Sequence, residues 1–335
     1  MAYFRAAENS IHRGFLTSLP SPVKYMFAYG SGVFRQQGHA SDKANMLDYI
    51  VVVDDPLQWH TENLVKHSRH YSFLRFGGPK FLTEIQRGFG AGVYFNTLVK
   101  FEDRLVKYGV VATDDLLADL RDWTTLYISG RLHKPVLTVQ DTADSSFRQA
   151  MLDNLRSAVR TASLLLPDAF TDEELFLRIA NLSYAGDFRM IFGEDKNKVR
   201  NIVLPHLDKF HEIYRPILKE EQYIDASANY RTFQQDCSPK TKLLLLGLLP
   251  RNLKERVIRD RFRDNRNKDV SIILEDLAHS ADCSKIVDKG CRQIVSYSSW
   301  WQSVKGIFTA GIIKSVRYSA TKVIKMIKGG MKKGS

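Results

Sequence analysis

The run Leu47–Val53 constrains the fold of this chain more than any other segment. It is short and rich in β-branched residues, and such a run predicts a buried strand. Pro56 follows closely and fits the first turn of a helix. A preceding strand is expected over Val23–Tyr29, and it ends at a glycine-rich turn that starts with Gly30.

Hairpin and helix signals follow this pair of strands. Val93–Lys100 and Arg104–Ala112 predict a β-hairpin, and Thr113 begins an amphipathic helix, so residues 1–142 are expected to form a mixed α and β domain. Apolar periodicity then predicts helices near 146–166, 171–184 and 196–218, the second capped by Thr171. Three short helices in this order resemble a helix-turn-helix or winged-helix module over residues 143–222. Residues 223–295 are expected to form a C-terminal helical region.

Positive charge is concentrated at the end of the chain. The net charge is +12, and residues 291–335 hold nine Lys or Arg and no Asp or Glu, which leaves +3 for the first 290 residues. A localised basic block indicates an anionic binding surface, either lipid headgroups or nucleic acid.

Other features exclude several classes of protein. The three cysteines form no C-x-x-C pair, so neither a zinc site nor a redox motif is expected. A run of about 18 apolar residues, which a transmembrane helix needs, does not occur. The first residues lack the apolar core of a secretory signal.

The basic segment is also amphipathic. From Trp300 onward, apolar residues recur at steps of three or four, and basic residues fall on the opposite side. Residues 296–335 are therefore predicted to be a basic amphipathic tail that binds an anionic membrane surface. The alternative is a tail packed on the protein's own core. The predicted membrane contacts are Phe308, Ile312, Lys314 and Arg317.

The glycine turn and the buried strand together predict a phosphate site. Gly30 lets the backbone approach a phosphate, N–H groups at the start of a following helix would hold its oxygens, and Ser31 adds a donor. Asp48 opens the neighbouring strand, where its carboxylate would hold Mg²⁺ against the same triphosphate. This arrangement is typical of polymerase-β-like nucleotidyltransferases. The predicted nucleotide-binding residues are Gly30, Ser31, Gly32 and Arg35, and Asp48 is the predicted catalytic metal ligand.

A second metal ligand is missing from its usual position. Such enzymes commonly carry another acid two residues after the first, where this chain has Ile50. Asp54 shares the face of Asp48, but six residues of extended strand separate the two by about 20 Å. Glu102 and Asp103, at the tip of the predicted hairpin, are the candidates, and a solvated turn is the alternative for both; Glu102 is the predicted second ligand.

Longer motifs give the chain a specific resemblance. Residues 29–36, YGSGVFRQ, are similar to the signature of the mitochondrial translocator assembly and maintenance family, whose members are matrix-side phosphatidate cytidylyltransferases. The likeness is collinear from about residue 20 to residue 318. It includes LDY at 47–49, VDDP at 53–56, WH at 59–60, HYSF at 70–73, GAGVY at 90–94, KYGV at 107–110, GRL at 130–132, LSYAGDFR at 182–189, GEDK at 193–196 and KGIFTAG at 305–311.

The resemblance implies both a fold and a reaction. The fold is α+β, with a polymerase-β-like nucleotidyltransferase domain, a winged-helix-like domain and a C-terminal amphipathic helix. The reaction joins CTP and phosphatidic acid to give CDP-diacylglycerol and pyrophosphate, which feeds cardiolipin and phosphatidylglycerol synthesis. The implied place is the matrix side of the mitochondrial inner membrane, with peripheral attachment.

Cations should matter more than a general base in this reaction, because the lipid phosphate is already an anion. Lys66, on the helix after the Asp48 strand, is the predicted catalytic phosphate clamp. Arg189 is predicted to bind the lipid phosphate. The alternative for each is an ordinary surface cation.

Two other functions remain open. A nucleotidyltransferase acting on RNA or protein would use the basic tail to hold nucleic acid, but the apolar stripe favours a membrane, so no nucleic-acid partner is predicted. A non-catalytic assembly factor is disfavoured by the intact Ser31 and Asp48. His60, His67 and His70 are poorly spaced for a zinc site. The oligomeric state is not determined by the sequence.

Overall fold

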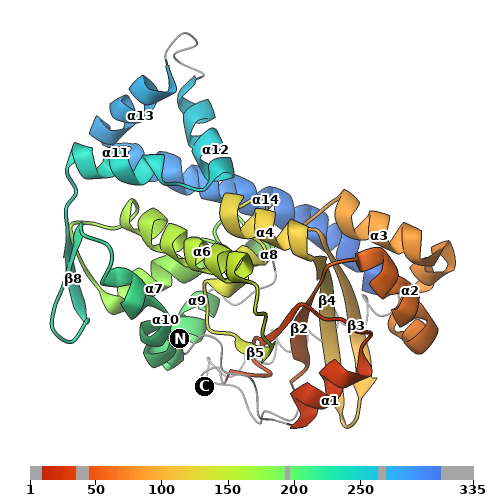
Figure 1. Ribbon diagram of the computed structural model, residues 1–335. Helices are drawn as coiled ribbons and strands as arrows, with labels where there is room; N and C mark the ends of the chain where they lie inside the picture. Colours follow the sequence, from red (N-terminus) through yellow and green to blue (C-terminus); the bar gives the residue numbers. More distant parts are fainter. Residues whose placement is uncertain (1–9, 35–44, 193–196, 263–268, 311–335) are drawn as a thin grey trace, which may run out of the picture.

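The centre of the molecule is a mixed five-stranded sheet. A computed structural model describes residues 10–34, 45–192, 197–262 and 269–310, and the strand order is β3-β4-β2-β1-β5 (Figure 1). Strand β2 runs parallel to β4, whereas β1–β2, β1–β5 and β3–β4 are antiparallel pairs. The strands are β1 Tyr25–Tyr29, β2 Leu47–Val53, β3 Val93–Phe101, β4 Arg104–Ala112 and β5 Leu137–Gln140.

The register of β2 brings three strands to one point. Every side chain of β2 is buried except that of Asp48, which is partly exposed. Asp48 pairs with Tyr29 of β1 on one side and with Lys107 of β4 on the other. Gly30, the residue after Tyr29, is thereby placed beside Asp48.

Both faces of the sheet are covered by helices, namely α1 Ser10–Ser18, α2 Pro56–His67, α4 Thr113–Asp122, α5 Ser129–Leu132 and α6 Ser145–Ser163. Ile50 and Val52 of β2 pack in a core with α4, α5 and α6. Tyr49 and Val51 pack in a second core with α1 and α2. Because side chains alternate along a strand, Asp48 faces the same side as Ile50, toward α4–α6.

A small helical layer flanks β3. It consists of η3 (Ser68–His70), η4 (Phe73–Gly77) and α3 (Gly78–Gly88). It packs through a separate apolar cluster that includes Tyr71, Leu82 and Tyr94.

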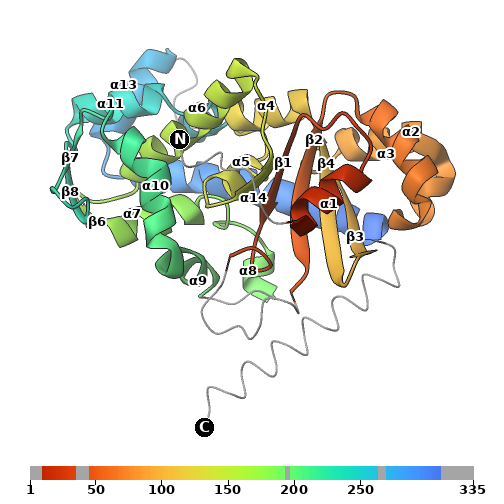
Figure 2. The same cartoon turned by 60° about the horizontal axis from the view of Figure 1, so that its bottom comes forward.

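The rest of the described chain forms a helical unit with its own apolar core. A three-stranded antiparallel sheet of order β6-β8-β7 lies at its far end, away from the five-stranded sheet (Figure 2). The helices are α7 Asp172–Asn181, α8 Arg189–Phe192, α9 Lys198–Val203, η5 Leu204–His206, α10 Leu207–Leu218, α11 Pro239–Gly247, α12 Arg251–Phe262 and α13 Val270–His279, and the strands are β6 Ala169–Thr171, β7 Ile224–Ala226 and β8 Thr232–Gln235.

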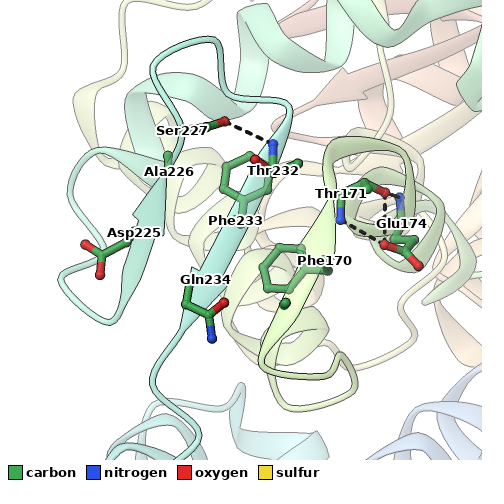
Figure 3. A pocket seen from close by; sticks show the side chains of 10 residues that line it. Phe170, Thr171, Glu174, Asp225, Ala226, Ser227, Thr232, Phe233 and Gln234 are labelled. Atoms are coloured by element: carbon green, nitrogen blue, oxygen red, sulfur yellow. Dashed lines mark hydrogen bonds between the residues drawn. The ribbon is translucent and has the colours of Figure 1, made fainter.

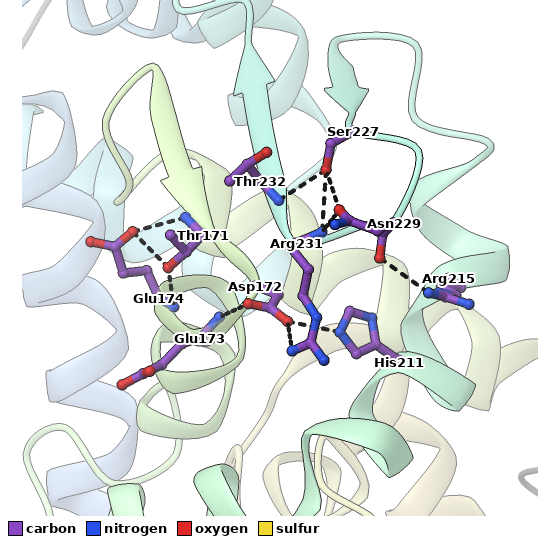
Figure 4. A network of polar contacts seen from close by, with 10 residues as sticks. All are labelled: Thr171, Asp172, Glu173, Glu174, His211, Arg215, Ser227, Asn229, Arg231 and Thr232. Carbon is purple, nitrogen blue, oxygen red and sulfur yellow. Dashed lines mark hydrogen bonds and ion pairs between the residues drawn. The ribbon is translucent and has the colours of Figure 1, made fainter.

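A polar network fixes the start of α7 within this unit (Figure 4). Thr171 and Glu174 form a reciprocal capping box, as the sequence predicts. Buried Asp172 accepts hydrogen bonds from Arg231 (2.8 Å) and lies 2.8 Å from Nε2 of His211. The network therefore ties α7 to α10 and to the loop before β8.

Helix α14, Cys283–Ala310, links the two parts of the molecule. Its first half lies in the helical core through Cys283, Val287 and Cys291. Its second half runs behind the five-stranded sheet toward α3 (Figure 1). There the side chain of Gln302 bonds to the main chain of Ala91 (3.0 Å) and Val93 (3.2 Å) at the start of β3.

The prediction of a mixed α and β protein is confirmed, and β2 and β4 span the predicted residues. Helix α1, strand β5 and the three-stranded sheet were not predicted from the sequence. The domain boundary predicted at 222/223 falls between strands of that sheet, and the one at 295/296 falls inside α14. Within the described residues, no helix has the length and hydropathy that a bilayer span requires.

Candidate active site

The turn after β1 places a glycine against the carboxylate of Asp48. Gly30 has a φ of 81°, a conformation that favours glycine, and a Cβ at this position would lie 3.5 Å from Oδ2 of Asp48. The Gly30 carbonyl accepts hydrogen bonds from the N–H groups of Val33 (3.1 Å) and Phe34 (2.9 Å). The described part of this segment is thus one helical turn, and Arg35 lies outside the described residues.

The next glycine of the turn has a packing role. A Cβ on Gly32 would lie 2.5 Å from the carbonyl oxygen of Met46, just before β2. Only a residue without a side chain lets the turn lie this close to β2. Gly32 therefore holds Ser31, which is partly exposed, near the carboxylate.

Asp48 has a cationic neighbour that sequence reasoning missed. Nζ of Lys107 lies 3.9 Å from Oδ1 of Asp48, and both side chains are partly exposed. The same ammonium lies 4.6 Å from the centre of the Phe95 ring. A carboxylate and an ammonium are therefore adjacent at the glycine turn.

A second missed cation, Arg131, lies beside the same turn. Its guanidinium is held between the rings of Tyr29 (4.5 Å) and Tyr127 (4.8 Å), and Nη2 donates to the Tyr127 hydroxyl (3.2 Å). Its buried Nε has no hydrogen-bond partner among the described residues. A buried donor without a partner is costly, and an anionic ligand would satisfy it.

The helical unit contributes Arg189 to the same place. Arg189 donates hydrogen bonds to buried Asp187, whose two carboxylate oxygens lie 2.9 and 3.1 Å from Nε of Arg189. Asp187 also accepts from the Arg189 main-chain N–H (3.0 Å). Asp187 is therefore the positioning partner of Arg189 at the start of α8. The predicted lipid-phosphate residue is thus held by Asp187, and it lies close enough to Tyr127 and Arg131 for their charges to act on it.

Close packing between the two parts of the molecule fixes these cations. A Cβ on Gly130 would lie 2.2 Å from Cβ of Ser183. Lys134, which is also buried, donates to the Gly130 carbonyl and to the Ser183 hydroxyl, the latter at 2.8 Å. A Cβ on Gly186 would lie 2.5 Å from the Arg292 carbonyl of α14. The glycines thus let α5, the 182–189 segment and α14 meet.

We call Lys107, Arg131, Lys134, Arg189 and Lys198 the cation cluster. Burial would raise the pKa of the Tyr127 phenol, but Arg131, Arg189 and Lys107 outweigh burial and lower it. Burial, together with repulsion from Arg131 and Lys198, sets the pKa of Lys134 well below its ordinary value. Arg131, Arg189 and Lys107 therefore all lie close enough to act on one phenol, and Lys134 lies near Arg131 and Lys198. A polyanion is the ligand that the field of such a cluster attracts.

The donor set near the turn fits a Mg²⁺ ion shared with a substrate. Within the described part of the chain, no three His, Cys, Asp or Glu side chains are arranged to hold a metal. Mg²⁺ commonly binds through one or two carboxylates, with substrate phosphates and water completing its shell. Asp48 provides one such carboxylate beside the Gly30 turn.

Two of the predicted residues do not join this arrangement. Lys66 is an exposed residue of α2, which packs on the opposite face of the sheet from the side chain of Asp48. Exposed Glu102 lies at the hairpin tip against α1, with Oε1 3.6 Å from where a Cβ of Gly14 would lie. Helix α1 belongs to that same opposite face. The geometry therefore supports neither Lys66 as a phosphate clamp nor Glu102 as a partner of Asp48.

Other polar and concave features lie elsewhere. His60 hydrogen-bonds with Tyr71 and Gln86, each at 2.8 Å, and His70 lies 2.9 Å from the Tyr108 hydroxyl. A shallow depression is lined by β6, β7 and β8, including Phe170 and Phe233 (Figure 3). It lies at the far end of the helical unit, remote from the cation cluster (Figure 1).

Comparison with known proteins identifies the family. A family model described as phosphatidate cytidylyltransferase, mitochondrial, matches residues 12–325. The chain belongs to this family. Proteins of that name from Danio rerio and Xenopus laevis are 47% and 46% identical, covering 98% and 94% of both chains in each pair. The one from Caenorhabditis elegans is 38% identical over 95% of this chain and 98% of its own.

Motifs of the mitochondrial phosphatidate cytidylyltransferase family converge on the cation cluster. Residues 29–36, 47–49, 107–110, 130–132 and 182–189 are scattered along the sequence, and the fold brings their described parts together. Lys107 and Arg131 were quoted within these motifs without a role. The sequence signal that could have identified them is a cation within two residues of a glycine in the same motif.

The C-terminal motif is partly buried, not a free tail. The Lys305 ammonium donates to the main-chain oxygens of Gln86 (2.9 Å) and Phe89 (2.6 Å) at the end of α3. Burial lowers the pKa of Lys305 to about 7, and Asp115 partly opposes this. The segment 296–310 is therefore held on the protein, which is the alternative named for the tail. Phe308 is 46% exposed, and Ile312, Lys314 and Arg317 lie outside the described residues.

Proposed function

We propose that this protein transfers a cytidylyl group from CTP to phosphatidic acid, giving CDP-diacylglycerol and pyrophosphate. The observation that carries the proposal is the meeting of the Gly30 turn, the Asp48 carboxylate and the cation cluster on one face of the sheet. This arrangement suits a triphosphate next to a second phosphate. The printed names of relatives at 38–47% identity over nearly the whole chain supply the substrates.

The bond changes are those of a nucleotidyl transfer. An oxygen of the lipid phosphate attacks the α-phosphorus of CTP, and the bond between that phosphorus and the oxygen bridging to the β-phosphate breaks. Pyrophosphate leaves with the electron pair of the broken bond. The attacking oxygen is already anionic, so the protein needs no general base for this step.

Each part of the site has a role in this mechanism. The backbone of the Gly30 turn and the Ser31 hydroxyl bind triphosphate oxygens. Lys107 and Arg131 stabilise the charge that develops on the α-phosphate and the leaving group. Arg189, held by Asp187, receives the lipid phosphate. Fixed cations need little rearrangement during reaction, which is the main source of electrostatic catalysis.

We further propose that the reaction uses Mg²⁺ bound by Asp48. When bound, the ion would neutralise charge on the triphosphate. Asp48 would orient the ion, and the adjacent ammonium of Lys107 would help to neutralise the negative charge that remains on the triphosphate.

The proposal extends to the domains of the fold and to the location of the protein in the cell. We assign the five-stranded sheet with α1, α2, α4 and α5 to a polymerase-β-like nucleotidyltransferase domain, and α6, α7 and α10, within residues 143–222, to a winged-helix-like domain. The printed names of the relatives include the word mitochondrial. We place the protein at the matrix face of the inner membrane, peripherally bound, where its product would feed cardiolipin and phosphatidylglycerol synthesis.

The test is a transfer assay with CTP labelled at the α-phosphate. The full chain is incubated with Mg²⁺ and vesicles of phosphatidylcholine with or without phosphatidic acid. The proposal predicts label in a lipid product and an equal amount of pyrophosphate, both dependent on phosphatidic acid. Label transferred to added RNA or to protein, with none in lipid, would instead support the alternative nucleotidyltransferase.

A further inference from the structure

The second half of α14 has its polar side turned inward and its apolar side turned outward. Buried positions recur at steps of four, three and four residues, and three exposed aromatic residues each directly precede one of these buried positions. Exposed are Tyr297 (64%), Trp301 (40%) and Phe308 (46%). The buried stripe consists of Ser298, Gln302, Lys305 and Thr309.

This arrangement reverses the usual pattern of a surface helix, whose apolar stripe faces the core. The buried polar groups are satisfied, because Lys305 bonds to carbonyls at the end of α3 and Gln302 bonds to β3. These bonds fix the rotation of the helix about its axis. The aromatic stripe is therefore held outward, and an apolar environment outside the protein is what would stabilise it.

Neighbouring aromatic side chains extend the exposed stripe. The Phe89 ring lies 6.5 Å from that of Trp301, and Trp301 lies 6.5 Å from Tyr297. The Ser72 hydroxyl, one residue before η4, donates to the Phe308 carbonyl at 2.9 Å. Phe73 in η4 is 51% exposed. We call this the aromatic surface, and it consists of Phe73, Phe89, Tyr297, Trp300, Trp301 and Phe308.

The aromatic surface reaches the proposed lipid-phosphate residue. The Trp300 ring, 54% exposed, lies 5.3 Å from that of Phe188, and Phe188 directly precedes Arg189. On the other side, Gln302 binds the main chain of Val93, two residues before Phe95, whose ring contacts Lys107. The surface therefore adjoins the part of the molecule where a lipid headgroup would react.

Charge around the aromatic surface selects the occupant. Residues 68–88, which include η4 and α3, carry four Lys or Arg and one Glu. The Arg75 guanidinium lies 5.0 Å from the centre of the ring of Phe76, which is 81% exposed. The chain beyond α14 carries seven Lys or Arg and no Asp or Glu. Aromatic side chains with a basic rim match the interface of an anionic bilayer.

We propose that the aromatic surface docks on an anionic lipid bilayer and so presents Arg189 to phosphatidic acid within it. This proposal rests on the proposed function for the choice of lipid. It adds that folded parts of the protein, η4 and the second half of α14, contact the membrane. It also gives Lys305 a structural purpose, since its buried ammonium orients the stripe.

The test is vesicle flotation of the full chain carrying Tyr297→Gln, Trp301→Gln and Phe308→Gln. The matched control carries Leu244→Gln, Leu248→Gln and Ile272→Gln, which remove similarly exposed apolar side chains from α11, from the residue directly after it and from α13. Vesicles contain phosphatidylcholine with phosphatidic acid, and each protein is assayed at low salt and at about 0.5 M salt, where charge attraction is screened. Thermal unfolding confirms that both variants fold.

The proposal predicts that the aromatic variant loses bound protein at high salt by at least about tenfold, while the control floats like the unchanged chain. Both variants should turn over a short-chain, soluble phosphatidic acid at the unchanged rate. Flotation of the aromatic variant equal to that of the control would overturn the proposal. The proposal would also be overturned if light scattering showed that the unchanged chain is a dimer, that the aromatic substitutions make it a monomer, and that flotation is unaffected. The aromatic surface would then bind a second copy of the chain. Absence of turnover by every protein would reject the proposed function without deciding the docking result.

Discussion

Replacing Arg131 with methionine is the perturbation whose effects the structure defines best. The guanidinium lies within 5 Å of two tyrosine ring centres, at 4.5 and 4.8 Å, and each such contact contributes about 0.5–2 kcal/mol. Arg131→Met should therefore lower the free energy of unfolding by about 1–4 kcal/mol. Relief of the repulsion between Arg131 and Lys134 should reduce that loss.

The effect on CTP binding should be separate from the effect on stability. Loss of one hydrogen bond from a charged donor to a phosphate costs about 1.5–3 kcal/mol, so the Kd for CTP should rise roughly 10- to 100-fold. Arg131→Lys should give an intermediate Kd, because it retains the charge without the planar fork that stacks between the tyrosines.

Calorimetric titration with CTP and Mg²⁺ measures both variants directly. Arg156→Met is the matched control, since it removes one positive charge from α6 that is paired with Asp153 and Glu220 in the helical unit. An unchanged Kd in folded Arg131→Met, or an equal loss in Arg156→Met, would refute the assignment of Arg131 to the nucleotide site.

Three further predictions concern the turn, the packing and the acid stability. Ser31→Ala should raise the Kd for CTP at least about tenfold in the same titration, since it removes a donor to an anion, and an unchanged Kd would reject that role. Gly130→Ala should lower the free energy of unfolding by about 1–3 kcal/mol in denaturant titration, because its Cβ would lie 2.2 Å from that of Ser183, whereas Gly88→Ala, which has open space, should not destabilise. Burial lowers the pKa of His60 to about 4, and the hydrogen bond that His60 Nε2 donates to Oε1 of Gln86 partly opposes this. The unfolded state therefore binds more protons between pH 6.5 and 4, and the stability contribution present above pH 6.5 is lost as pH falls. That contribution is about 3 kcal/mol. In His60→Gln, the free energy of unfolding should therefore fall less steeply between pH 6.5 and 4 than in the unchanged chain. An equally steep fall would show that other groups cause it.

The turn and the buried strand were predictable because their signals are local. A β-branched run with turns at both ends predicts the bounds of β2, and Gly30 marks the residue after the end of β1. Strand pairing then brings Asp48 to Gly30 without any long-range information beyond the order of the strands. That part of the candidate site follows from pattern and geometry alone.

The cations were less predictable because their positions depend on tertiary packing. Lys107 reaches Asp48 only through the parallel pairing of β2 with β4, and Arg131 arrives by the fit of Gly130 against Ser183. Lys66 looked suitable by sequence proximity, but the face on which α2 packs is not encoded in its own periodicity. The amphipathic pattern of α14 likewise could not show that the Lys305 ammonium is buried. Its hydrogen-bond acceptors are carbonyls at the end of α3, which lie 216 to 220 residues earlier in the chain.

The central claim is that lipid cytidylyl transfer takes place on the Asp48 face of the sheet. The most direct measurement compares the rate of CDP-diacylglycerol formation by Asp48→Asn and by Lys66→Met, with Mg²⁺ and phosphatidic acid vesicles. The account predicts that Asp48→Asn abolishes measurable turnover while retaining the thermal unfolding temperature, and that Lys66→Met, on the opposite face, retains the full rate. Normal turnover by Asp48→Asn, or loss of turnover only in Lys66→Met, would contradict the account.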